Sequence, residues 1–138
     1  MAVFEILEHP ADVGFRANGA SYRELLENSA AALLALMCEV GGVEERESRE
    51  ILSTGSDRES LLFAWLAEIL AVADGEGLFF RRAVVTDLAE GRVGGVAHGE
   101  PIDKARHRRG TAIKAITYHQ LAVEESAAGW KATVFVDV

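Results

Sequence analysis

Cysteine is almost absent from this chain: Cys38 is the only one among 138 residues. A disulfide framework and a cysteine-rich zinc site are therefore both excluded. Proline occurs only twice, and no tract rich in proline or serine marks a linker. No apolar run reaches the ~18 residues that a membrane-spanning helix needs. The first residues lack the basic start and the apolar stretch of a secretory signal, so we expect a cytoplasmic protein.

The chain has the size of one domain. For a mass of 14.9 kDa, folding buries about 68% of the surface of the unfolded chain, which is enough for a core without a metal or disulfide. Hydrophobic residues make up 49% and charged residues 26%, close to the average for globular proteins. We therefore treat residues 1–138 as a single folded domain.

Basic residues are fewer than acidic residues in this chain. The 22 acidic residues outnumber the 14 basic ones, for a net charge of −8. The excess lies in residues 1–76, whose net charge is −10, whereas residues 77–138 have a net charge of +2. This balance argues against tight autonomous binding to a nucleic-acid backbone. It leaves open a cation site, a basic protein partner or a local basic patch.

Hydrophobic periodicity predicts an α+β protein. Strands are expected at residues 3–7, 12–18, 43–54, 78–88, 92–99, 112–125 and 130–138. One helix should begin at a capping box of Ser21 and Glu24 and stop before Gly41. A second should begin at a box of Ser56 and Glu59 and end near residues 74–77. Residues 100–111 are expected to form a loop. Two helices covering one face of a mostly antiparallel sheet would give two layers.

Carboxylates gather at one end of this predicted sheet. Asp137 lies one residue from the terminal carboxylate of Val138. If the last strand pairs with the strand that begins at Asp12, three carboxylates converge and repel each other unless a cation neutralises them. Hard oxygen ligands of this kind suit Ca²⁺ or Mg²⁺. The alternative, favoured on spacing alone, is that Asp12 caps a turn and Asp137 is a solvated end residue.

No motif assembles a catalytic centre by itself. The four histidines do not pair at the spacing of helix-borne zinc ligands, and His9 is the one with carboxylate neighbours, Glu8 and Asp12. A phosphate-binding loop and a nucleophile elbow are both missing. Residues 104–109 form the one basic cluster. This cluster could meet the phosphates of RNA or a nucleotide, could meet an acidic partner, or could be a solvated loop.

The motifs together resemble the archease family. Residues 8–14, EHPADVG, are similar to its N-terminal signature. The other similar segments are residues 62–66, 74–77, 99–103, 106–107, 110–119, 129–130 and 135–138. They follow the family's order along the whole chain. Pro10 stands where the family usually has threonine, which leaves the detail of the loop before Asp12 in doubt.

The resemblance implies a small cytosolic protein that is not an enzyme but activates an RtcB-type RNA ligase in tRNA splicing and RNA repair. Such proteins promote guanylylation of the ligase by GTP and sustain its turnover. The resemblance also implies a metal site, assigned to calcium with Mg²⁺ or Mn²⁺ as alternatives, at Asp12, Asp137 and Val138. Motif membership makes further residues candidates for partner contacts: His9, Arg106, His107 and Lys114.

Two other function classes remain open at this point. One is a metal-dependent hydrolase that uses the same carboxylates, with His9 as general base. The other is an RNA-binding accessory, or a modulator of a tRNA-modifying enzyme, that uses residues 104–109. The sequence gives neither the oligomeric state nor the surface that docks.

Overall fold

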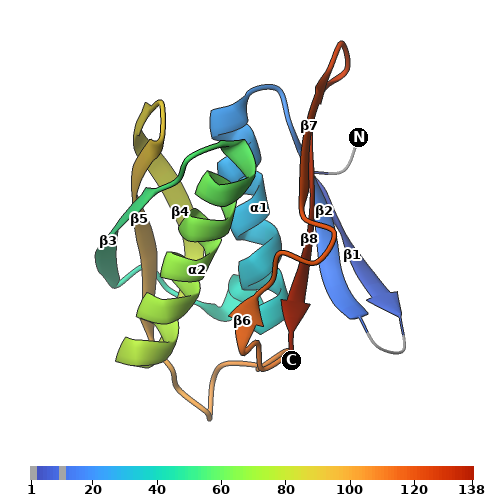
Figure 1. Cartoon of the computed structure of the whole chain (residues 1–138). Helices are drawn as coiled ribbons and strands as arrows, with labels where there is room; N and C mark the ends of the chain where they lie inside the picture. Colours follow the sequence, from blue (N-terminus) through green and yellow to red (C-terminus); the bar gives the residue numbers. More distant parts are fainter. Residues whose placement is uncertain (1–2, 10–11) are drawn as a thin grey trace.

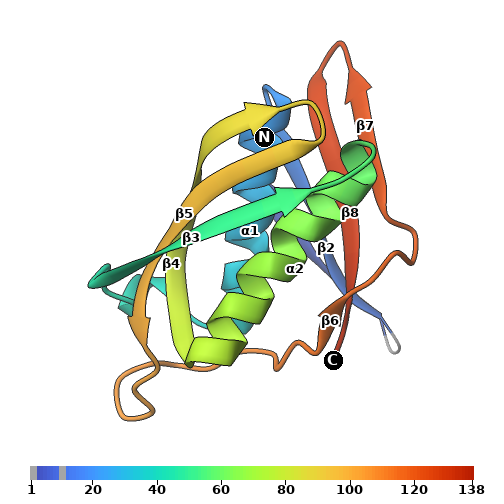
Figure 2. The same ribbon diagram turned by 60° about the vertical axis from the view of Figure 1, so that its left-hand side comes forward.

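Two antiparallel sheets enclose two helices in this protein (Figures 1 and 2). The computed structural model describes residues 3–9 and 12–138, and for residues 8, 9 and 12 it describes the backbone alone. The helices are α1 (Tyr22–Met37) and α2 (Arg58–Glu76). The strands are β1 (Phe4–His9), β2 (Asp12–Gly19), β3 (Glu47–Thr54), β4 (Leu78–Ala89), β5 (Arg92–Pro101), β6 (Ala115–Ile116), β7 (Ala122–Ser126) and β8 (Gly129–Asp137).

The strand order explains how the predicted α+β class is realised. One sheet has the order β1-β2-β8-β6, with β7 also pairing with β8, and the other has the order β3-β5-β4. Each helix contacts strands of both sheets, so the core lies between the two sheets. The α+β class is confirmed, and the strands divide between two sheets instead of forming one. No helix in the described part of the chain is long and apolar enough to cross a membrane.

Side-chain caps begin both helices. At α1, Ser21 Oγ accepts from the Glu24 N–H at 3.1 Å and Glu24 Oε1 accepts from the Ala20 N–H at 3.0 Å. At α2 the predicted box is displaced by one residue. Asp57 accepts from the Ser60 N–H at 2.8 Å, and Ser60 Oγ accepts from the Asp57 N–H at 3.0 Å. The Asp57 carboxylate thus takes the place expected for Ser56.

The helices reach the sheets through a few large buried side chains. The Trp65 side chain on α2 is fully buried and donates from Nε1 to the Leu26 carbonyl at 3.0 Å, which ties α2 to α1. Its ring lies against β5 at Gly95. A Cβ at that position would lie 2.3 Å from the Val84 oxygen and 2.6 Å from the Trp65 ring, so the close approach of α2 to β5 requires glycine there.

Two predicted strands are shorter than the periodicity indicates. β3 begins at Glu47 because the preceding residues form a 3-10 turn, Val40–Gly42, and its exit. The strand predicted at residues 112–125 is interrupted after β6 by a turn in which the Leu121 N–H donates to the Tyr118 carbonyl at 3.2 Å. Gln120 takes the left-handed conformation there, with φ 51°. The turn separates β6 from β7 and places Tyr118 on the surface.

Candidate functional site

The end of β8 and the start of β2 meet at one end of the molecule. β2 and β8 are antiparallel neighbours, with Val13 opposite Val136. Asp12 and Asp137 are the next residues of β2 and β8 at that end of the pair. In β1, His9 is opposite Asp12. The strand pairing on which the carboxylate cluster depended is therefore present, and we call Asp12, Asp137 and Val138 the acidic tip.

The two residues of the acidic tip whose side chains the structure describes, Asp137 and Val138, are exposed to solvent. Val138 is 54% exposed and Asp137 is exposed. No ion pair of Asp137 occurs within the described residues. Within that part of the chain no three His, Cys, Asp or Glu side chains gather as a metal group, and the side chain of Asp12 lies outside it. The Asp137 carboxylate supplies hard oxygen atoms, the type of ligand that Ca²⁺ takes in proteins.

The short strand β6 pairs with β8 beside the tip, on the side of β8 away from β2. The Lys114 N–H donates to the Asp137 carbonyl at 2.8 Å, and Ala115 pairs with Asp137 in the register of β6 and β8. Lys114 is exposed, and no acidic partner of its ammonium group is present among the described side chains. Lys114 is therefore the candidate contact residue that the structure places directly beside the tip.

Arg106 and His107 belong to a buried network around Glu100, not to the tip. The Glu100 carboxylate is only 2% exposed. It accepts from Arg106 Nη2 at 2.5 Å, from the Glu44 N–H at 2.6 Å and from His107 Nε2 at 2.9 Å. The Asp103 N–H donates to His107 Nδ1 at 2.9 Å. Because Nδ1 accepts the hydrogen bond from the Asp103 N–H, it carries no hydrogen of its own, and His107 is the neutral tautomer with its hydrogen on Nε2.

These contacts keep Glu100 ionised. The hydrogen bond from Arg106 is the largest cause, followed by that from the Glu44 N–H, and together they lower the pKa of Glu100 from 4.5 to about 2 against the opposing effect of burial. The ring of His107 is buried and both of its nitrogens are occupied, so it has no group to offer a partner. The network links residues within the loop after β5 and ties this loop to the turn at Gly42. The Gly42 carbonyl accepts a hydrogen bond from Arg106 Nη1 at 3.0 Å.

Other basic side chains of residues 104–109 also contact neighbouring residues. Arg108 Nε lies 3.5 Å from Glu39, on the surface. The Arg109 guanidinium lies 5.7 Å from the centroid of the Phe79 ring. Within the described part of the chain, Lys104 is left as the basic residue of the cluster without such a partner. The cluster therefore gives little support to a phosphate-binding surface.

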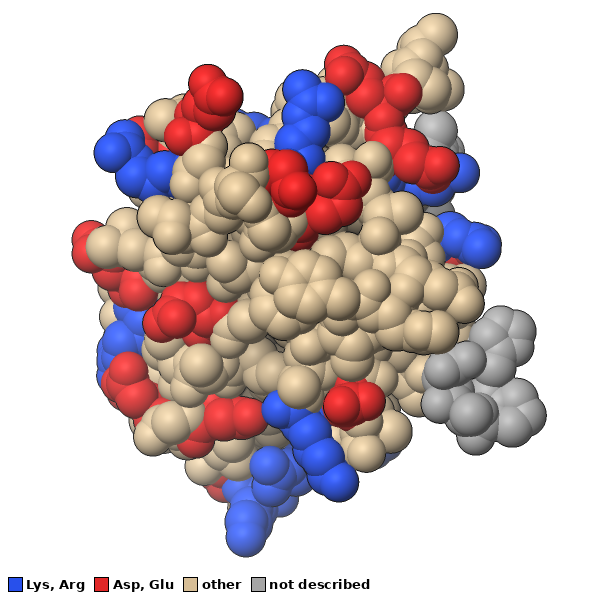
Figure 3. All heavy atoms as spheres, viewed as in Figure 1, with Lys and Arg blue, Asp and Glu red and all other residues tan. Residues whose placement is uncertain are grey.

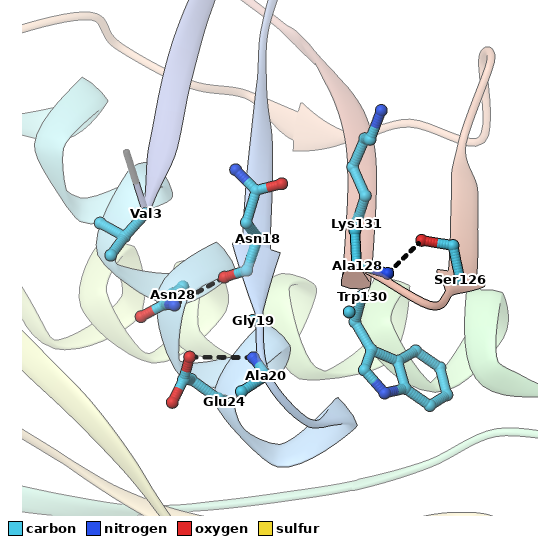
Figure 4. Close-up of a pocket in the computed structure, with 11 residues that line it drawn as sticks. Val3, Asn18, Gly19, Ala20, Glu24, Asn28, Ser126, Ala128, Trp130 and Lys131 are labelled. Atoms are coloured by element: carbon cyan, nitrogen blue, oxygen red, sulfur yellow. Dashed lines mark hydrogen bonds between the residues drawn. The ribbon is translucent and has the colours of Figure 1, made fainter. Parts of the chain in front are cut away.

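The cavities lie away from the tip. Figure 4 shows one of about 550 Å³ at the start of β8, where Glu24, Asn28, Trp130 and Lys131 surround an opening bounded by Asn18. The start of β8 is the opposite end of that strand from Asp137. Two others, each of about 540 Å³, are lined by residues of the turn at Gly42 and by the start of α2. None of the three includes Asp137 or Val138, so they offer no enclosed pocket at the tip.

Comparison with known proteins decides the family. The model of the Archease protein family (MTH1598/TM1083) matches residues 4–138. The chain belongs to the archease family. Among curated archeases, that of Sulfurisphaera tokodaii is 37% identical over 139 residues, with 100% of both chains covered. That of Methanopyrus kandleri is 39% identical over 138 residues, covering 98% of this chain and 99% of the relative.

Two solved archease-family structures share the fold. The solution structure of Methanobacterium thermoautotrophicum protein 1598 is 34% identical, with a TM-score of 0.82 and 100% of both chains covered. The crystal structure of a Thermotoga maritima archease, described as a possible chaperone, is 25% identical with a TM-score of 0.67. It covers 96% of this chain and 94% of that one. Both matches extend over nearly the whole chain.

Sequence reasoning missed two features of the site region. The first is the role of Glu100: a buried glutamate followed six and seven residues later by Arg106 and His107 was a usable signal. The second is the stacking of Tyr118 on Phe63, whose ring centroids lie 4.0 Å apart. The two residues are 55 positions apart in the sequence, and no local pattern pairs them.

Proposed function

We propose that the chain is a non-catalytic activator of an RtcB-type RNA ligase, and that it acts through the acidic tip. Membership of the archease family supports the ligase as partner. The observation that carries the proposal is the pairing of β2 with β8 up to Val13 and Val136, since Asp12 and Asp137 are the next residues of the two strands at that end. This pairing supports the proposal, because Asp137 is exposed at the end of β8, where it could enter a cleft of another protein.

The proposal assigns a divalent cation to Asp12, Asp137 and the carboxylate of Val138, with calcium as the first choice. Such a cation would neutralise the repulsion between the carboxylates and fix their spacing. The tip would then approach a ligase active site that handles GTP and metal ions and is electropositive for that reason. Lys114, held beside Asp137 by the backbone, would contact an acidic group or a phosphate at the rim of that site.

The two other function classes receive less support from the geometry. A hydrolase using the same carboxylates needs an enclosed pocket at the tip, and the three cavities described above lie elsewhere. An RNA-binding accessory needs uncompensated cations, whereas Arg106 and Arg108 are already paired with acidic side chains.

The test is the turnover of the RtcB-type ligase from the same organism, with and without the chain. We expect the wild-type chain to raise the number of RNA joining events per ligase and to hydrolyse no phosphate ester alone. Asp137→Asn should lose the stimulation, and Asp74→Asn, at an exposed acid of α2 that does not belong to the tip, should keep it. An absence of stimulation by the wild-type chain would contradict the proposal.

The cation is tested separately by calorimetric titration of Ca²⁺, Mg²⁺ and Mn²⁺ into the metal-free chain. One site is expected, and Asp12→Asn and Asp137→Asn should each abolish it. Equal binding by Asp137→Asn and the wild type would remove the cation from the tip.

A further inference from the structure

Tyr118 lies on the surface as part of a rigid aromatic stack. Its side chain is 61% exposed. Its ring lies parallel to that of Phe63 on α2, with centroids 4.0 Å apart and an interplanar angle of 7°. The stack fixes one face of the tyrosine ring against the protein and leaves the remainder to solvent. An exposed aromatic side chain held in one orientation loses little conformational entropy on binding.

The surface around this stack carries little charge. Ala67 and Ala71 follow Phe63 at intervals of four residues, so they lie on the same side of α2. Between Leu61 and Ala73, Glu68 is the one charged residue of the helix. Figure 3 shows an uncharged area over α2 and the segment beside it, with the Lys, Arg, Asp and Glu side chains at its edges. A helix that is apolar on nearly every side is usually covered.

The stack is fastened to the strand that carries the tip. The N–H and the hydroxyl of Thr117 both donate to the Phe135 carbonyl, at 3.1 and 2.9 Å. The His119 ring lies 5.7 Å from that of Phe135. Together with the hydrogen bond from the Lys114 N–H to the Asp137 carbonyl, these contacts join residues 114–119 to the C-terminal end of β8. The uncharged face and the acidic tip are therefore connected through the C-terminal end of β8.

We propose that this surface, the Phe63–Tyr118 face, docks on the protein partner whose electropositive site receives the acidic tip. The occupant of the face is this partner, which accepts the Tyr118 ring in an apolar hollow beside that site. The inference rests on the proposed function. A charge-poor centre with an aromatic anchor and a charged rim is the composition of a protein–protein interface. A nucleic-acid strand would need lysine or arginine at the centre of the face, where Figure 3 shows none.

The test measures affinity between the chain and the RtcB-type ligase of the same organism by biolayer interferometry. Tyr118→Ser should weaken binding about tenfold or more, as truncation of an interface anchor does, and Tyr118→Phe should bind like the wild type. Leu52→Ser is the matched control, because Leu52 is 63% exposed on β3 in the other sheet, and it should have no effect. At saturating concentration, Tyr118→Ser should still stimulate guanylylation of the ligase fully, whereas Asp137→Asn should bind without stimulating it.

Each alternative outcome has a defined meaning. Wild-type affinity for Tyr118→Ser, or an equal loss for Leu52→Ser, would overturn the docking face while the tip mechanism stands. A wild-type chain that neither binds nor stimulates the ligase would overturn the proposed function itself. An effect of Tyr118→Ser confined to RNA binding, or to dimerisation in analytical ultracentrifugation, would assign the face to RNA or to a second copy and overturn the proposal.

A second variant guards against loss of folding. If circular dichroism shows that Tyr118→Ser is unfolded, Ala71→Arg decides, because it adds a charge at an exposed position of the same helix face without removing a packed group. Ala127→Arg, in the exposed turn between β7 and β8, is its control. Weakened ligase binding by Ala71→Arg alone supports the docking face, and equal binding by both overturns it.

Discussion

At the scale of single residues, Glu100 stands out in the described part of the chain because its carboxylate is both buried and ionised. Its buried charge is stabilised by Arg106, the Glu44 N–H and the neutral His107. A buried charge that loses its partner is strongly destabilising. We infer that this carboxylate holds the loop after β5 in place, and that the loop in turn leads the chain to β6 beside the tip.

Glu100→Gln should lower the melting temperature at neutral pH, because Arg106 loses the charge that it faces. The folded-state pKa of Glu100 is depressed from 4.5 to about 2. Its stabilising contribution is therefore complete above pH 4.5 and is lost as the pH falls toward 2. The gap between the melting temperatures of the two proteins should close over that interval in a pH series followed by circular dichroism. Glu124→Gln, at an exposed strand position, should show no such gap, and a gap for Glu100→Gln that is unchanged at pH 2 would contradict the account.

At the scale of elements, the approach of α2 to β5 depends on one glycine. Gly95→Ala forces a methyl group against the Val84 carbonyl and the Trp65 ring, and overpacking of this kind costs roughly 1–3 kcal/mol. Gly75→Ala is the matched substitution, because a Cβ there meets nothing within 4 Å and glycine inside a helix costs roughly 0.5–1 kcal/mol relative to alanine. Urea unfolding should therefore show opposite signs for the two variants. The same sign for both would refute this explanation of the packing.

The edge of β4 is sealed by two side chains of α1. The Val85 N–H donates to Glu27 Oε2 at 2.9 Å, and Arg23 donates to the Val85 carbonyl. They meet β4 beside an irregularity between Val85 and Asp87 in its pairing with β5. An edge strand left open is a site of aggregation, so these contacts protect the sheet where it faces the helix.

Glu27→Ala leaves the Val85 amide without its acceptor and should cost roughly 1–3 kcal/mol of unfolding free energy. Hydrogen exchange at the Val85 amide should become faster, as followed by NMR. Glu68→Ala on α2, whose carboxylate has no such bond among the described residues, serves as the control. Unchanged exchange at Val85 would show that Glu27 does not protect the strand.

Local elements were predictable from the sequence because they depend on local chemistry. Helix starts and most strands follow from caps and periodicity, with an error of one residue at Asp57. The division into two sheets was not predictable, because it depends on pairings between distant strands. The separation of β6 from β7 arises from a turn at Gln120 that no glycine or proline marks. At the site, the pairing of β2 with β8 was expected and is present, whereas the metal site at Asp12, Asp137 and Val138 stays a prediction, because Pro10 and the side chain of Asp12 lie outside the described residues.

At the scale of the whole molecule, the net charge of −8 separates into parts with different roles. Most acidic residues lie on the solvated surface or in ion pairs with arginine, such as Glu45 with Arg82 at 2.8 Å. The tip draws Asp12 from the acidic first half of the chain and Asp137 from the basic second half. The proposed activator therefore presents a concentrated charge at one end and a neutral docking face beside it.

Single-turnover guanylylation of the partner ligase tests the central claim most directly. The ligase is mixed with labelled GTP and with the wild-type chain, Asp137→Asn or the control Asp74→Asn, and formation of the covalent guanylate is followed over time. We predict that the wild type and Asp74→Asn accelerate guanylylation equally and that Asp137→Asn does not accelerate it. Acceleration by Asp137→Asn equal to that of the wild type would contradict the mechanism.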